Sequence, residues 1–138
     1  MAITTAGIPG RKSATGATAE MARWPAVQHL SFTVRDPERQ RAYYRDFLGF
    51  TDGGGDGIAE LRAGATKLVL LRADRVAPPD NVHFGFQEPS RTAVDEWGRK
   101  ARAAGLRIDF GPGVADWGGY VLYFRDPDGY QIEIWTDD

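Results

Sequence analysis

The sequence contains only two histidines, His29 and His83, and each lies in a stretch where polar and apolar residues alternate. Glu133 lies in a similar stretch near the end of the chain. Side chains of a β-strand alternate between its two faces, so all three residues fall on the polar face of a predicted strand. Two imidazoles and one carboxylate suit a divalent transition metal and leave positions open for a substrate.

Each of these residues also has a simpler interpretation. A single strand histidine is more often exposed or hydrogen-bonded than a metal ligand. A carboxylate is costly to bury without a partner, so Glu133 either faces water or binds something. A shared site is favoured because the two histidines, His29 and His83, occupy the same place in two similar halves of the chain.

The two halves follow one order: a strand, a helix and three further strands. The first strands align on their histidines, and the later strands align without gaps at an offset of 63 residues, which pairs Leu70 with Glu133. An internal repeat indicates pseudo-twofold architecture. The sequence therefore predicts an α+β fold in which two βαβββ modules, about 24–75 and 80–138, form a curved mixed sheet with the helices outside. The polar strand faces would line a shared cleft.

Local signals set the expected elements. Asp36 followed by Pro37 starts one helix, and Ser90 starts the other. In the last hairpin, Asp-Pro-Asp-Gly at 126–129 is a turn that favours pairing of Tyr123 with Glu133. Residues 51–57 and 111–119 are expected to be a turn and a loop. The strands are expected at 27–34, 58–62, 67–71, 81–87, 106–110, 120–125 and 130–135, and the helices at 37–48 and 91–104.

Composition excludes several classes of function. The chain has 138 residues, enough for one domain at 24–138, preceded by a flexible tail at 1–23. Its net charge of −2 gives no footprint for nucleic acid, and no apolar run is long enough for a membrane span. It has no cysteine, so disulfides and thiolate chemistry are excluded and a cytoplasmic location is expected.

These motifs resemble the vicinal oxygen chelate superfamily, which holds glyoxalases, extradiol dioxygenases, methylmalonyl-CoA epimerases, fosfomycin-resistance transferases and bleomycin-binding proteins. The segments that carry the resemblance are 29–36, 43–50, 82–84 and 123–133. The resemblance implies that His29, His83 and Glu133 bind one divalent metal ion, with Fe(II) or Mn favoured and Ni or Zn possible. It also implies a homodimer, often with the two halves of a site from different subunits.

The resemblance leaves the reaction open. Glyoxalase I and the epimerase have a fourth ligand at the position aligned with Leu70, which cannot bind metal. The three-ligand set resembles the extradiol dioxygenases and fosfomycin transferases, so dioxygenase-type chemistry on a small substrate with vicinal oxygens is slightly favoured. The alternatives are a glyoxalase-like lyase, isomerase or thiol transferase, and a bleomycin-resistance-type drug-binding protein. Tyr123 is the candidate catalytic residue, as a proton donor or hydrogen-bond donor.

The candidate substrate-binding residues lie on the same polar strand faces or in the loop beside them. The tryptophans suit a flat or apolar substrate, although ordinary core or dimer packing is the more common explanation for each of them. The candidates are Ser31, Trp117, Val121, Gln131 and Trp135.

Overall fold

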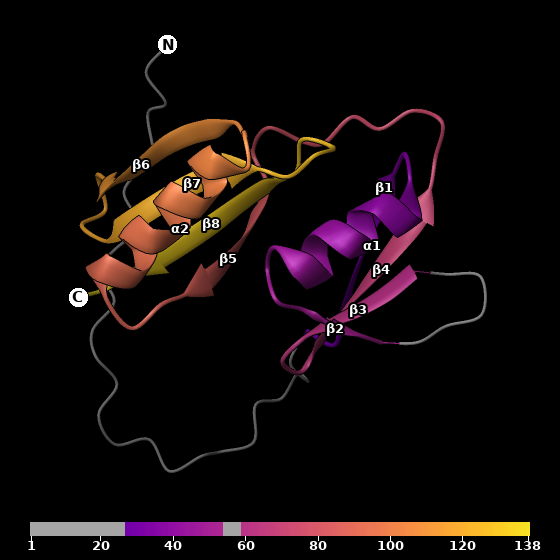
Figure 1. Cartoon of the computed structure of the whole chain (residues 1–138), viewed down its shortest axis with the longest axis horizontal. Coiled ribbons are helices and arrows are strands. Elements are labelled where there is room, and N and C mark those ends of the chain that lie inside the picture. The colour runs from indigo at the N-terminus through magenta and orange to yellow at the C-terminus, as the bar shows by residue number, and fades with distance from the viewer. Residues whose placement is uncertain (1–26, 54–58) are drawn as a thin grey trace.

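The computed structural model describes residues 27–53 and 59–138, and it consists of two modules lying side by side (Figure 1). The tail predicted at 1–23 lies outside the described residues. The first module comprises β1 (His29–Val34), α1 (Pro37–Asp46), β2 (Thr51–Asp52), β3 (Ala59–Ala63) and β4 (Thr66–Arg72). The second comprises β5 (His83–Gln87), α2 (Arg91–Ala103), β6 (Ile108–Val114), β7 (Tyr120–Arg125) and β8 (Gln131–Thr136).

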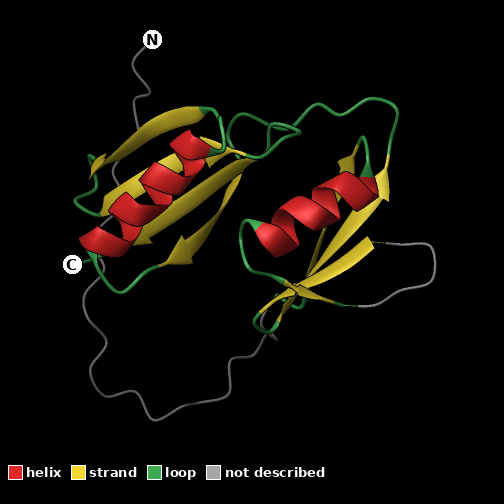
Figure 2. Ribbon diagram, in the orientation of Figure 1, coloured by secondary structure: helices red, strands yellow, loops and turns green. Residues whose placement is uncertain are grey.

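The strands form two four-stranded mixed sheets, in the orders β1-β4-β3-β2 and β5-β8-β7-β6. The first strand of each module runs parallel to the last, and the other pairs are antiparallel. Each helix lies across one face of its own sheet (Figure 2). The predicted α+β fold of two βαβββ modules is therefore confirmed, and we call the sheet face without a helix the open face.

Both helices begin and end where the sequence predicts, within two residues. The side chain of Asp36 accepts hydrogen bonds from the backbone N–H groups of Glu38 and Arg39, both at 3.1 Å, which satisfies donors that a helix start leaves unpaired. Ser90 does the same for Ala93 at 3.3 Å. Among the described residues, no helix is long and apolar enough to cross a membrane.

The two hairpins differ in length by one residue, which corrects the predicted alignment. Arg62 pairs with Lys67 across residues 63–66, whereas Arg125 pairs with Gln131 across the longer segment 126–130. The offset of 63 therefore holds before the turn and becomes 64 after it.

The residue equivalent to Glu133 is consequently Val69 and not Leu70. Val69 lies beside Ser31 just as Glu133 lies beside Gly85, and Leu70 is buried in the core. Valine cannot bind a metal ion either, so the inference that the first module lacks this ligand survives the correction.

Two further expectations about the strands are wrong. Thr51–Asp52 forms a short strand that pairs with β3 where a turn was expected. β6 continues through Gly111-Pro112-Gly113 to Val114, with register shifts between Ile108 and Gly113. Proline has no N–H for a sheet hydrogen bond, and it is tolerated here because β6 is an edge strand with an irregular register.

Aromatic side chains join the two modules in one core. Ring centroids of Phe50 and Phe86 lie 5.4 Å apart, and those of Phe32 and Phe84 lie 5.9 Å apart. Each pair links the first module to β5 of the second. Burial of such large rings and their tilted contacts stabilise the pairing of the modules.

The β7–β8 turn forms a polar clamp with the first module. Tyr44 Oη donates a 2.8 Å hydrogen bond to Asp126 Oδ2, and Gln40 Nε2 donates to the same oxygen. Both donors lie on α1, more than 80 residues away in sequence. Asp126 is 4% exposed, and its burial raises the pKa of the carboxyl group even though these hydrogen bonds favour its charged form.

Candidate functional site

His83 and Glu133 lie on the open face of the second sheet, on the paired strands β5 and β8. His83 Nε2 is 3.4 Å from Glu133 Oε2. The histidine side chain is 40% exposed and the glutamate side chain 12%. Both groups are acceptable metal ligands, and the imidazole remains accessible from outside the chain.

Gly85 leaves the space that the glutamate carboxylate fills. Gly85 is directly paired with Glu133, and a Cβ at this position would lie 2.6 Å from Glu133 Oε2. Any other residue would push the carboxylate away from its present place beside His83. Sequence reasoning missed this role, although the pairing of glycine with glutamate follows from the register of the parallel strands.

Tyr123 lies directly opposite Glu133, as the turn in the last hairpin predicts. Its hydroxyl donates a 2.5 Å hydrogen bond to Glu133 Oε1. Burial raises the pKa of Tyr123 well above the ordinary value, and the hydrogen bond to Glu133 and its negative charge act in the same direction. The phenol therefore keeps its proton at neutral pH.

His29 lies apart from these residues, on β1 of the other sheet, where it is exposed and paired with Lys67. In the described parts of the chain, no three His, Cys, Asp or Glu side chains lie close enough together to hold a metal ion. One chain therefore brings two of the three predicted ligands together, His83 and Glu133. This pair, which we call the half-site, fits two of the three ligand positions.

The tryptophans lie beside this half-site. The rings of Trp117 and Trp135 meet edge to face at a centroid distance of 6.0 Å. Trp117 is 54% exposed, and its ring lies over Gly119, where a Cβ would come within 1.9 Å of it. The missing side chain of Gly119 thus leaves the space that the Trp117 indole occupies. Sequence reasoning did not identify this role.

The other predicted substrate-binding residues are placed differently. Val121 has no exposed surface, so in this arrangement it supports the site and does not touch a ligand. Gln131 Nε2 donates a 2.8 Å hydrogen bond to Asp109 Oδ2, which also accepts from Arg125. Ser31 is exposed on the first sheet, away from the half-site.

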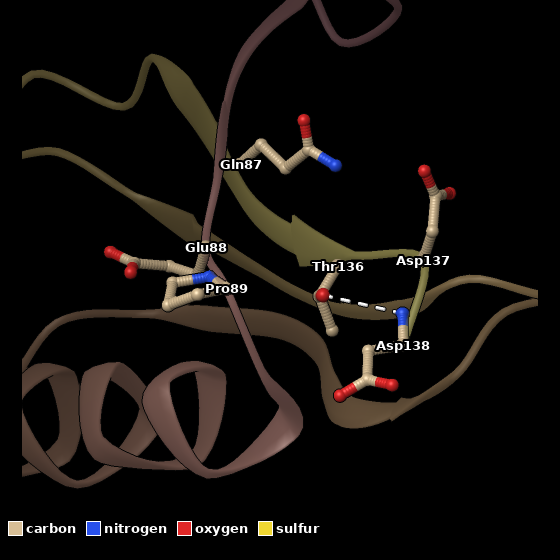
Figure 3. Close-up of a pocket in the computed structure, with 6 residues that line it drawn as sticks. All are labelled: Gln87, Glu88, Pro89, Thr136, Asp137 and Asp138. Atoms are coloured by element: carbon tan, nitrogen blue, oxygen red, sulfur yellow. Dashed lines mark hydrogen bonds between the residues drawn. The ribbon is translucent and has the colours of Figure 1, made fainter.

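A pocket of about 500 Å³ lies at the ends of β5 and β8 (Figure 3). Two of its polar groups are engaged within the chain: Glu88 Oε1 accepts from Trp97 Nε1 at 2.7 Å, and Thr136 Oγ1 accepts from the backbone N–H of Asp138 at 3.3 Å. None of the predicted site residues lines it.

Residues 26–134 match the family described as the Glyoxalase/Bleomycin resistance protein/Dioxygenase superfamily. The chain belongs to this superfamily. Among curated proteins, the uncharacterized protein PA2024 of Pseudomonas aeruginosa is 30% identical over 123 residues, which cover 80% of this chain and 87% of that protein. The recognition made from the sequence motifs is thereby confirmed.

Solved structures of the glyoxalase superfamily share the fold. A possible glyoxalase from Bacillus cereus has a TM-score of 0.68 at 26% identity, and the alignment covers 80% of this chain and 97% of that one. Lactoylglutathione lyase from Agrobacterium tumefaciens has a TM-score of 0.67 at 21% identity, covering 83% and 96%. At such identity the latter likeness shows the fold alone.

Proposed function

We propose that this glyoxalase-superfamily protein is a divalent-metal-dependent enzyme that acts on a small substrate with neighbouring oxygen atoms. The observation that carries the proposal is the half-site: His83 and Glu133 lie 3.4 Å apart, with Tyr123 bound to the glutamate. A carboxylate held in place by a phenol and a ligand-type imidazole is the arrangement expected beside a bound cation.

The third ligand would come from a second copy of the chain. His29 is exposed on the open face of the first sheet. In a twofold dimer, each contact is made twice. If the first sheet of one chain meets the second sheet of its partner, the partner's first sheet therefore meets the second sheet of that chain. A homodimer of this kind gives two sites, each with His29 from one chain and His83 with Glu133 from the other.

The residues of the chain define what such a site does. Glu133 would hold the metal through its carboxylate, and Oε1 of that carboxylate accepts a hydrogen bond from the Tyr123 hydroxyl. Tyr123 keeps that proton at neutral pH and is positioned as a hydrogen-bond donor or proton donor. A bound divalent ion would act as a Lewis acid or, as Fe(II), support reaction with O2. Dioxygenase-type chemistry is the first choice, because three ligands leave room for both a substrate and O2.

Redox-neutral chemistry, as in a lyase, isomerase or thiol transferase, is the alternative for the same ligands. Oxygen consumption by the Fe(II)-loaded protein with catechols or diketones separates the two. The edge-to-face pair of Trp117 and Trp135 favours a third candidate, binding of an aromatic drug. That candidate predicts ligand binding that is unchanged when the metal is removed.

Mixing two defective variants tests the shared site. His29→Ala and Glu133→Gln each damage every site of their own homodimers, so each should bind little metal. After unfolding and refolding of an equimolar mixture, half of the dimers are mixed, and each mixed dimer holds one intact site. We therefore expect metal content to recover to about one quarter of the wild-type value, measured by elemental analysis.

The controls for this experiment are the two variants refolded separately and a mixture of His83→Ala with Glu133→Gln. Those two changes affect the same half-site, so their mixture should recover no metal. A monomer in sedimentation, or equal recovery in both mixtures, contradicts the shared site. Metal dependence itself is contradicted if the wild-type protein contains no metal after purification without chelator and takes up none when metal is added.

A further inference from the structure

The open face of the first sheet carries a pair of like charges that the second sheet avoids. Arg62 on β3 and Lys67 on β4 are directly paired, which places their side chains next to each other on one face. Like charges in this relation destabilise a sheet. The Lys67 ammonium is 3.3 Å from Glu60 Oε2, so one carboxylate compensates one of the two charges.

The equivalent arginine of the second sheet shows the contrast. Arg125 occupies the position of Arg62 in the repeat, and its side chain is only 11% exposed. Its Nε donates to Asp109, and Gln131 replaces the lysine as its cross-strand neighbour. Arg62 is exposed, and no carboxylate in the described part of the chain forms an ion pair with it.

A pocket of about 440 Å³ adjoins Arg62. Its apolar walls are Phe50 and Phe86, whose rings meet at 5.4 Å across the boundary between the modules. Much of the remaining wall is small, since Gly49, Ala63 and Gly64 line it. The volume lies in the range of small-molecule sites, which combine apolar walls with a few polar anchors.

We propose that this pocket binds a small organic anion, with its carboxylate or phosphate on Arg62 and its apolar part against Phe50 and Phe86. A guanidinium forms two parallel hydrogen bonds to either anion. The neighbouring Lys67 adds positive potential, and an anion relieves the repulsion between the two cations. This site lies at the boundary between the modules, and none of the proposed metal ligands lines it.

Calorimetric titration of the full chain with benzoate, in the presence of a chelator, tests the proposal. We expect saturable binding of benzoate and at least about tenfold weaker binding of benzyl alcohol, which has the ring without the charge. Arg62→Gln should weaken benzoate binding by about tenfold or more. Arg62 is exposed, so this variant should melt like the wild type.

Arg99→Gln is the matched control. Arg99 is an exposed arginine on α2, so this change removes the same charge from a place outside the pocket lining. Benzoate binding should remain unchanged in this variant. The proposal is overturned by the absence of saturable binding, by equal binding of benzyl alcohol, or by equal weakening in the two variants. Because no metal is present, none of these results bears on the metal site.

Discussion

A glycine decides where the carboxylate of the half-site lies. Gly85 has no side chain on the open face, and the carboxylate of Glu133 occupies that space beside His83. The equivalent place on the first sheet is taken by Ser31, which is paired with Val69. The two sheets therefore differ at both positions of this pair. The second sheet has a glutamate beside a glycine, and the first has a valine beside a serine.

Replacing Gly85 with alanine should weaken metal binding while the chain still folds. The added Cβ would lie 2.6 Å from Glu133 Oε2, so the carboxylate must move away from His83. We expect metal affinity to fall by about ten- to a hundredfold, the range seen when groups that orient ligands are changed. Titration of metal-free protein with Mn²⁺ measures this change.

Gly113→Ala is the control for this substitution, because a Cβ there would meet only the Phe110 ring, at an ordinary 3.7 Å. Gly113 lies on β6 of the same sheet, so both variants add one methyl group to that sheet. If the two alanines lower metal affinity equally, the space at Gly85 is not what positions Glu133.

Tyr123 should ionise only at strongly alkaline pH. Burial raises its pKa above the ordinary value near 10, so the unfolded chain loses this proton before the folded protein does. The stability that this phenol contributes is complete below about pH 10 and is lost as the pH rises above it. The difference in tyrosinate absorbance between wild type and Tyr123→Phe should therefore appear well above pH 10. A difference centred at pH 10 would show that Tyr123 is not buried beside Glu133 in solution.

At the scale of elements, the β7–β8 turn does more than reverse the chain. Asp126 Oδ1 accepts hydrogen bonds from the backbone N–H groups of Asp128 and Tyr130, both at 2.9 Å, while Oδ2 accepts from α1. Tyr130 Oη in turn donates to the carbonyl oxygen of Thr33 at 2.6 Å. One turn is thus hydrogen-bonded to both β1 and α1 of the other module.

Replacing Asp126 with alanine should strongly destabilise the fold. The change leaves Tyr44 Oη and Gln40 Nε2 buried without their acceptor, which we expect to cost about 3 kcal/mol or more of unfolding free energy. Asp126→Asn keeps one acceptor oxygen and should cost less. Asp137→Ala changes an exposed carboxylate and should stay within about 0.5 kcal/mol of wild type. Urea denaturation compares the three, and an alanine variant at position 126 as stable as the control would rule out the clamp.

Local signals predicted the elements well where they act over a few residues. Asp36 and Ser90 mark helix starts, and the last turn predicts that Tyr123 faces Glu133, because capping and turn geometry are short-range effects. The same reasoning failed for β6, since Gly111-Pro112-Gly113 is typical of a loop. An irregular edge strand accommodates those residues, and that depends on neighbours distant in sequence.

At the scale of the whole molecule, prediction from the sequence reached its limit at the placement of the modules. The repeat shows that His29 and His83 are equivalent, but equivalence under a pseudo-twofold does not make two residues neighbours. Aromatic contacts and the Asp126 clamp set how the modules meet, and that arrangement leaves His29 on a separate sheet. The wrong alignment of Leu70 with Glu133 has a similar origin. The extra residue in one turn can be recognised only from the register of the paired strands.

The clamp also bears on the timing of ligand exchange. Separating the modules would break buried hydrogen bonds at Asp126 and open an aromatic core, so that motion is slow compared with a side-chain rotation. The Trp117 side chain is more than half exposed and lies against a glycine, so a change of its rotamer breaks few contacts. Ligand exchange at the second sheet would then need only rotation of exposed side chains such as Trp117, without separation of the modules.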